Sequence, residues 1–345
     1  MRGSQRRAAA GSGPGSLPAG AASYPGPVRV PRVSPRLYRR IVLATLASLV
    51  FIMVTGAAVR LTGSGLGCST WPSCEPDSFT PRSASDTHGM VEWVNRLITG
   101  AVMLFTVAAV LGARWRSPYR RDLFRVALGL PAWVFANALV GALVVWLHLS
   151  PVSVIGHFLL SLGAVANAVV LYERSAHGVP DPGRARTATP QVVTACRALV
   201  AAACVVIVTG TLVTGSGPHA GDERADRLAL TVGDVVRVHG VSMLVFLALT
   251  VVAVRLAHRG DAAPAVVGRL HELLVVLVAQ AAVGYWQYFA GVPAWLVGFH
   301  VLGAALVWIA VLRVWLALTI RVPEDAAVGA AGRPVAVTSA TGITS

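Results

Sequence analysis

The chain has 345 residues, of which 55% are hydrophobic and 13% are charged. Soluble domains carry about 25% charged residues, so this composition excludes an ordinary soluble domain and favours a protein whose solvent is membrane lipid. The formal net charge of +14 comes from arginine alone, because the sequence contains no lysine. Most of these arginines lie between or beside apolar runs, which indicates membrane topology and no nucleic-acid partner.

Apolar runs of about 20 residues, the length that crosses a bilayer, occur eight times. They lie near 40–60, 91–113, 125–147, 152–173, 195–215, 235–257, 270–290 and 294–318. The first run starts too far from the N-terminus, and is too long, for a cleavable signal peptide, so we expect it to be the first span. The predicted fold class is an all-α polytopic membrane protein with eight transmembrane helices.

Arginine collects on one side of these spans, and that side is expected to be cytoplasmic. The arginines concerned are Arg32, Arg36, Arg39 and Arg40, then Arg114, Arg116, Arg120 and Arg121, then Arg174, Arg184 and Arg186, and then Arg255, Arg259 and Arg269. The opposite loops carry acidic residues instead, which are Glu75, Asp77, Asp86, Asp222, Glu223 and Asp226. Both termini are therefore predicted to lie in the cytoplasm.

The sequence also contains an internal repeat. Gly141 precedes His157 by 16 residues, and Gly284 precedes His300 by the same 16. Four spans separate equivalent points, so the repeat predicts two pseudo-symmetric four-helix bundles related as parallel repeats. The echoed segments include Thr55-Gly56 with Thr209-Gly210, and Thr62-Gly63-Ser64-Gly65 with Thr214-Gly215-Ser216-Gly217. The predicted boundaries are a disordered tail at 1–35, a first half at 36–175, a cytoplasmic linker at 176–194, a second half at 195–320 and a disordered tail at 321–345.

Three histidines, His157, His239 and His300, lie inside even-numbered spans, about five residues from the outer end. At a rise of 1.5 Å per residue they share a depth of about 7 Å. Ionisable residues within a span are costly and mark functional sites. His239 and His300 belong to one bundle and can face each other across it, as the two axial ligands of a haem iron do. A hydrogen bond to a neighbouring helix is the alternative for each, and zinc or copper is the lesser one for the set.

The first half differs at the position that corresponds to His239. Counting back 144 residues gives Asn95, and an amide is a poor ligand for iron. Glu92 and His88 share roughly one helix face with Asn95. Glu92, opposite His157, is expected either to pair with an arginine or to take part in proton chemistry. His88 is either a ligand for a haem high in the bundle or a surface histidine.

Three arginines, Arg60, Arg96 and Arg237, lie near the outer ends of spans, where the arginine bias is otherwise absent. Haem propionates are carboxylates that suit the guanidinium fork, so these residues are candidate propionate contacts. The alternative is that they reach the lipid phosphates.

The run Thr55–Cys74, followed by Val91-Glu92-Trp93-Val94-Asn95-Arg96, resembles the first span, first outer loop and second-span entry of the haem A synthase family. Together with the two halves and the three span histidines, the resemblance covers residues 36–320. It implies an oxidoreductase acting on a CH or CH2 group, which oxidises a ring methyl of haem O in steps to the formyl group of haem A for terminal oxidase assembly. It also implies a multi-pass protein of the plasma membrane with haem sites towards the outer face.

In this family pattern, His239 and His300 would hold a haem b, His157 would bind the substrate haem and Glu92 would be catalytic. The family has Glu, two residues and then His-Arg, whereas Asn95 stands before Arg96 in this chain. Either His88 supplies the missing ligand, or the substrate haem is held on one side only, or this branch is no longer fully active.

The resemblance implies haem O as the substrate, with haem O synthase and a ferredoxin-like or quinone redox partner as candidate partners, and it leaves a homo-oligomer open. Cys68 and Cys74 flank a short loop on the outer, oxidising side and are expected to form a disulfide. Cys196 and Cys204 are expected to be packing or lipid-facing residues. Two rival functions remain, a dihaem cytochrome that passes electrons without modifying haem and a proton-coupled transporter.

Overall fold

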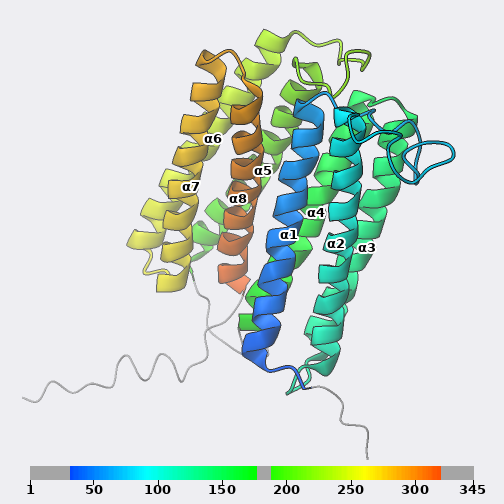
Figure 1. Ribbon diagram of the computed structural model, residues 1–345. Helices are drawn as coiled ribbons and strands as arrows, with labels where there is room; N and C mark the ends of the chain where they lie inside the picture. Colours follow the sequence, from blue (N-terminus) through cyan, green and yellow to red (C-terminus); the bar gives the residue numbers. More distant parts are fainter. Residues whose placement is uncertain (1–31, 177–187, 320–345) are drawn as a thin grey trace, which may run out of the picture. The chain divides into compact units, whose positions relative to one another are not determined.

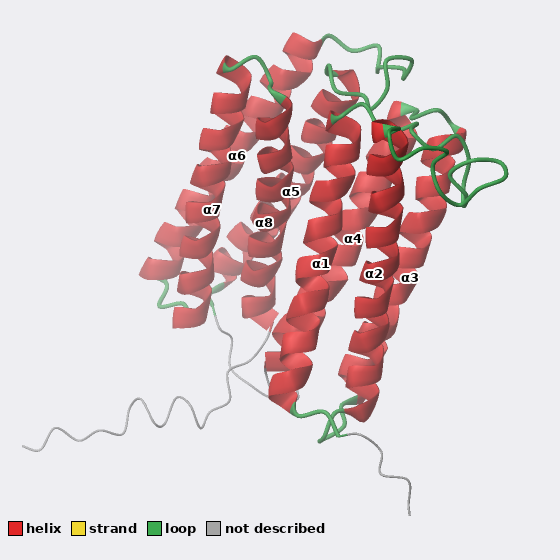
Figure 2. Cartoon of the chain, in the orientation of Figure 1, coloured by secondary structure: helices red, strands yellow, loops and turns green. Residues whose placement is uncertain are grey.

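The computed structural model describes residues 32–176 and 188–319, and the regular structure in them is eight long helices (Figures 1 and 2). The predicted C-terminal tail, nearly all of the N-terminal tail and most of the linker lie outside these residues. The helices are α1 (Pro35–Leu61), α2 (Thr87–Trp115), α3 (Arg121–Trp146), α4 (Pro151–Ala176), α5 (Pro190–Ser216), α6 (Val232–Arg259), α7 (Pro264–Phe289) and α8 (Ala294–Thr319). Each contains one predicted span, so the prediction of eight helices is confirmed.

Several helices begin where the sequence supplies a capping side chain or a proline. The Ser34 hydroxyl accepts a hydrogen bond from the Leu37 amide (3.2 Å) at the start of α1, and Asp86 caps α2 through the Gly89 amide (2.9 Å). Such caps satisfy amides that have no partner within the helix. Proline stands in the first turn of α1, α5 and α7, where its missing N–H costs nothing.

The helices form two rings of neighbours. In the first ring α1 contacts α2 and α4, and α3 lies between α2 and α4; in the second, α5 contacts α6 and α8, and α7 lies between α6 and α8. Each ring encloses its own apolar core. The rings meet where α8 packs on α1 and α4, and where α4 packs on α5. This is the arrangement expected of two four-helix bundles, while the symmetry axis and the side of the termini stay predictions.

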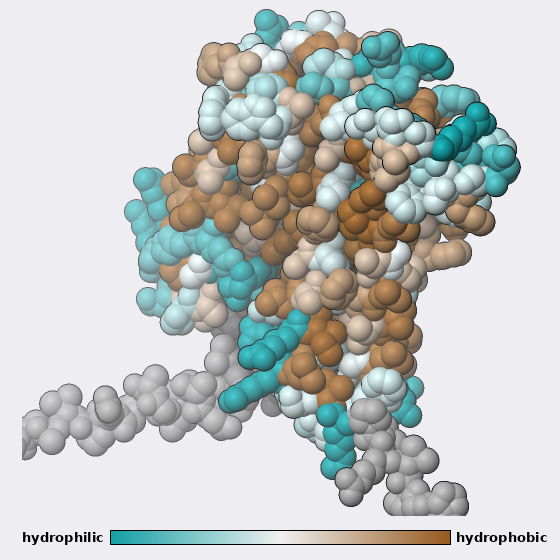
Figure 3. All heavy atoms as spheres, in the orientation of Figure 1, coloured by the Kyte–Doolittle hydropathy of each residue, from teal (hydrophilic) through white to brown (hydrophobic). Residues whose placement is uncertain are grey.

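The sides of the helices expose many large apolar side chains. Leu104, Val152, Val275 and Phe289 are each about 70% exposed or more. Figure 3 shows hydrophobic surface along the helices, with hydrophilic residues gathered near their ends and in the loops. All eight helices are long and apolar enough to cross a bilayer. Exposed apolar surface of this extent needs lipid as its surroundings, so the chain is a multi-pass membrane protein.

The two bundles are joined at the end that carries loops 62–86 and 217–231, which we name the outer end after its predicted side. The Gly65 amide donates to the Gly221 carbonyl (2.9 Å), and Arg60 Nη2 donates to the Thr214 carbonyl (2.8 Å). A side chain at Gly65 would place its Cβ 2.9 Å from Leu149 Cδ1. The same Cβ would lie 3.2 Å from the Gly221 carbonyl oxygen, so glycine favours the close approach of the two loops.

The opposite, inner end is joined by charged side chains. Arg313 of α8 donates to Glu173 of α4 (2.7 Å) and also pairs with Glu272 of α7. Arg269 of α7 pairs with Glu272 (2.9 Å) and lies 3.5 Å from the Glu173 carboxylate. The Glu173 side chain is buried, so this network holds charge inside the contact between the two bundles.

Candidate functional site

The rings of His239 and His300 face each other across the second bundle. Their centroids are 6.3 Å apart and their planes are inclined by 71°. His300 and His157 each lie six residues after the first residue of their helices, and His239 lies seven residues after the first residue of α6, all at the outer end. The predicted shared depth and the facing pair are therefore present, while haem ligation by these residues stays a prediction.

A glycine of the preceding helix lies against each of the three histidine rings. A Cβ built at Gly210 or at Gly284 would lie 3.0 Å from the Cε1 atom of His239 or His300, respectively. A Cβ built at Gly141 would lie 3.5 Å from His157 Cε1. The 16-residue spacing of Gly141 and His157, and of Gly284 and His300, thus reflects helical hairpins. In each hairpin the histidine ring packs on the glycine backbone of the preceding helix.

The ring nitrogens of the pair suit metal binding. His239 Nδ1 lies 3.2 Å from the Thr209 hydroxyl, which lies 3.1 Å from the Ser242 hydroxyl. Such a contact orients a ligating imidazole and leaves Nε2 for the metal. With metal–nitrogen bonds of about 2 Å on each side, two axial imidazoles place their centroids about 6 Å apart. The observed 6.3 Å fits a haem iron between them. Thr209 was not predicted to contact the site, although its place in the repeated Thr-Gly pair was a signal.

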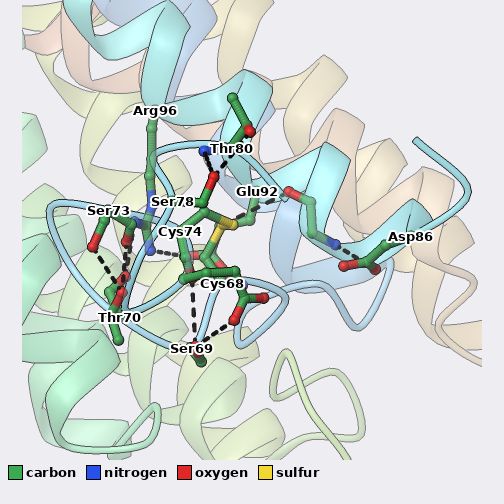
Figure 4. The surroundings of a disulfide bond; sticks show 12 residues. Cys68, Ser69, Thr70, Ser73, Cys74, Ser78, Thr80, Asp86, Glu92 and Arg96 are labelled. Atoms are coloured by element: carbon green, nitrogen blue, oxygen red, sulfur yellow. Dashed lines mark hydrogen bonds and ion pairs between the residues drawn. A yellow bond between two sulfur atoms is a disulfide. The ribbon is translucent and has the colours of Figure 1, made fainter. Parts of the chain in front are cut away.

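The region around Glu92 is built by a disulfide loop. Cys68 and Cys74 form a disulfide, as predicted, and both are buried. Glu92 is buried as well, and its Oε2 accepts a hydrogen bond from the Cys68 amide (2.9 Å; Figure 4). Its Oε1 accepts from Arg96 Nη2 (2.6 Å). Glu92 therefore pairs with an arginine, which is one of the two outcomes expected from its position in the span.

The Arg96 side chain binds backbone carbonyls of the same loop. Its Nη1 donates to the carbonyls of Thr70 and Ser73, each at 2.9 Å, and Figure 4 shows its side chain reaching into the loop. The Glu92 and Arg96 side chains thus anchor the loop to the start of α2. Propionate binding by Arg96 stays a prediction, and a propionate there would have to share the guanidinium with these carbonyls.

The other two candidate propionate contacts have different surroundings. Arg60 joins the two bundles through the Thr214 carbonyl, and its buried Nε has no partner among the described residues. The Arg237 side chain is 81% exposed and pairs loosely with Asp234 at 3.3 Å. Neither residue is held in a way that prevents propionate binding, which stays a prediction for both.

The remaining candidates lie around the entry of α2. His88 is exposed, and its Nδ1 is 3.0 Å from the Ser64 hydroxyl. Asn95 Oδ1 is buried without a hydrogen-bond partner in the described part of the chain.

The two remaining cysteines lie on α5. Cys196 is buried and Cys204 is exposed, and both are free thiols, in line with the packing and lipid-facing roles expected of them.

Comparison with known proteins gives a match over residues 39–221 to the family model described as cytochrome oxidase assembly protein. A haem A synthase from Bacillus licheniformis is 27% identical over 130 residues, which are 37% of this chain and 42% of that protein. A haem A synthase from Bacillus pumilus is 32% identical over 133 residues, or 38% and 42% of the two chains. A protohaem IX farnesyltransferase from Chloroflexus aurantiacus is 30% identical over 162 residues, or 45% and 27%.

The chain thus spans less than half the length of the curated relatives it matches. The family match includes Glu92, Asn95 and His157, and it ends before His239 and His300. The case for a metal-binding second bundle therefore depends on its own geometry.

Proposed function

The chain belongs to the cytochrome oxidase assembly protein family, and from this membership we propose that it acts in haem A synthesis, oxidising a ring methyl of haem O in steps to the formyl group of haem A. It does so as a multi-pass protein of the plasma membrane, with the histidine layer towards the outer face. The observation that carries the proposal is the facing pair of His239 and His300. A paired imidazole site of this geometry suits haem iron.

The two bundles have different tasks in this proposal. His239 and His300 would hold a resident haem b in the second bundle, and Thr209 would orient His239. A bound haem b would pass on, one at a time, the electrons that leave the methyl group when it is oxidised. His157 would bind the substrate haem O in the first bundle, with its ring set against Gly141. The guanidinium groups of Arg60 and Arg237 would receive propionates.

Glu92 would be the catalytic residue. Oxidation of a methyl group to a formyl group with electrons leaving to a partner takes an oxygen atom from water and releases protons, and a buried carboxylate beside the substrate can accept these protons. Its negative charge would also favour a methyl carbon that becomes electron-poor. The Cys68 amide and Arg96 fix both carboxylate oxygens in place. Each oxygen keeps a second lone pair that can accept a proton, so the pairing with Arg96 and the proton role are compatible.

The partners follow from the same chemistry. Haem O is the substrate, and a haem O synthase would deliver it; the likeness to a protohaem IX farnesyltransferase fits a place in a related haem pathway. The electrons leave through a ferredoxin-like or quinone partner. The product serves terminal oxidase assembly, as the family description suggests.

The proposal is tested by haem extraction and chromatography with mass detection. The full chain is expressed in a host that makes haem O and lacks its own haem A synthase. We expect haem A or its hydroxylated intermediate to appear with the chain and to be absent with Glu92→Ala. Glu75→Ala, which removes a carboxylate of the same loop region that pairs with the exposed Arg82, is the matched control and should keep the product.

The second candidate function is a dihaem cytochrome that only passes electrons. The departure at Asn95 favours it over haem O oxidation, because the family pattern has a histidine before the arginine and this chain has Asn95 before Arg96. If only unmodified haem co-purifies with the chain in the experiment above, this second function replaces the first.

A further inference from the structure

The two bundles present different groups at equivalent places around their centres. In the second bundle, His239 fills the space beside Gly210, and its Nδ1 meets the Thr209 hydroxyl. The equivalent glycine of the first bundle is Gly56, on α1. A Cβ built there meets no described atom within 4 Å. The space beside Gly56 is therefore open where its counterpart holds an imidazole.

Asn95 occupies the position of that imidazole on α2. Its Oδ1 is buried and has no hydrogen-bond partner within residues 32–176 and 188–319. The Thr55 hydroxyl, which corresponds to that of Thr209, donates instead to the Ile52 carbonyl of its own helix (3.2 Å). A buried amide oxygen without a partner is costly, so this part of the bundle suits a small polar ligand.

The opposite wall of the first bundle keeps its imidazole. His157 lies against Gly141 as His300 lies against Gly284. Its Nδ1, like that of His300, is buried and without a partner in the described ranges. The first bundle therefore offers one imidazole at the depth at which the second offers two.

His88 does not replace the missing imidazole. It lies in the first turn of α2, seven residues before Asn95, which is about 10 Å along the helix axis. Its ring is exposed at the outer end and is held by the Ser64 hydroxyl (3.0 Å). Ser64 is itself buried and within 2.9 Å of the Thr62 hydroxyl, so this contact belongs to the loop.

From these contrasts we propose that the first bundle binds a haem iron through His157 alone and leaves the other axial position to a small exchangeable ligand beside the Asn95 amide. The second bundle binds its iron through two imidazoles and has no exchangeable position. The inference rests on the proposed function in one respect, that the first bundle takes up haem. It adds that the iron of the substrate haem is open to water or another small molecule.

Iron with one imidazole and a weak or absent second ligand is high-spin, whereas iron between two imidazoles is low-spin. The test is therefore electron paramagnetic resonance and optical spectroscopy of the purified full chain, loaded with ferric haem in both bundles. We expect one high-spin and one low-spin component. Added imidazole should convert the high-spin component to low-spin in the unaltered chain, a test that needs no variant.

Variants assign the two components. Asn95→His should abolish the high-spin signal without added imidazole, because it restores the second ligand. Thr99→His, which places a histidine one turn deeper on the same helix, is the matched control and should keep the high-spin signal. His88→Ala should also leave both signals unchanged.

The outcomes separate this inference from the proposed function. Two low-spin components in the unaltered chain, or conversion of a low-spin to a high-spin component by His88→Ala, would overturn the single-ligand site and leave haem A synthesis standing. A first bundle that takes up no haem would overturn the proposed function, and the single-ligand site with it.

Discussion

Glu173 of α4 and Arg313 of α8 form an ion pair of 2.7 Å that crosses the contact between the two bundles. The Glu173 side chain is 7% exposed and that of Arg313 is 22% exposed. Charges so far from water are tolerated when they are paired and hydrogen-bonded. The pair is therefore expected to set how the bundles dock.

Removing one partner should destabilise the protein. Arg313→Ala removes the nearest cation of the buried Glu173 carboxylate and leaves Arg269 at 3.5 Å, so the loss is expected to be about 2 kcal/mol, less than for a fully uncompensated buried charge. Arg82→Ala breaks the exposed pair with Glu75 (3.5 Å) and should cost under about 1 kcal/mol. Thermal unfolding in detergent measures both. Equal unfolding temperatures for the two variants would contradict a docking role for Arg313.

A side chain at Gly284 should displace His300. The Cβ of Gly284→Val would lie 3.0 Å from the ring, and its methyl groups would force the ring to move. We expect the haem of the second bundle to be lost, as measured by haem per chain after purification. Gly268→Val, in the same helix, adds its Cβ where no described atom lies within 4 Å, and it should keep the haem. Equal haem contents would rule out the packing of His300 on α7 as a requirement.

Thr209→Val should weaken haem binding by about tenfold, because it removes the hydrogen-bonding partner of His239 Nδ1 (3.2 Å). It should also raise the reduction potential of the second haem, since an imidazole without this contact is a poorer electron donor to ferric iron. Thr211→Val is the control, because the Thr211 hydroxyl donates only to the Val208 carbonyl among the contacts described. A haem-binding titration gives the affinity and a potentiometric titration gives the potential, and an unchanged potential would argue against the contact.

Glu92 has two roles that variants can separate, the anchoring of the disulfide loop and the proposed chemistry. Glu92→Gln keeps an oxygen that can accept from the Cys68 amide, but it loses the charge paired with Arg96. If the charge is catalytic, Glu92→Gln is as inactive as Glu92→Ala, and limited proteolysis cuts loop 62–86 only in Glu92→Ala.

Activity retained by Glu92→Gln and lost in Glu92→Ala would instead assign Glu92 to the loop alone. Arg96→Met, which removes the donors to the Thr70 and Ser73 carbonyls, is the reference for a released loop in the same proteolysis assay.

The spans and the histidine layer could be predicted from the sequence because both are local or periodic. Length and hydropathy define a span, and a fixed rise per residue gives depth. The comparison of His239 with Asn95 also needed only counting. Thr55 and Thr209 are 154 residues apart, whereas Asn95 and His239 are 144 residues apart. The difference of ten residues arises because the loop before α2 is ten residues longer than the loop before α6.

The partners of the charged residues could not be predicted. Glu173 and Arg313 are 140 residues apart, and no pattern in either helix indicates which helix it will meet. The position of both charged residues inside predicted spans does indicate that each needs a partner, although it does not identify that partner. The guanidinium group of Arg96 suits carboxylates, which is why the sequence predicts a propionate contact. The contact with the Thr70 carbonyl could not be predicted, because the loop that carries Thr70 has no regular secondary structure.

The bundles are fastened to each other at both ends. Backbone contacts between Gly65 and Gly221 close one end, and the Glu173–Arg313 pair closes the other. Sliding or hinging of one bundle against the other would break one of these attachments. Two redox groups seated in the bundles would therefore keep a constant separation throughout turnover. The speed at which an electron passes between them would then depend on that fixed separation, the driving force and the reorganisation energy.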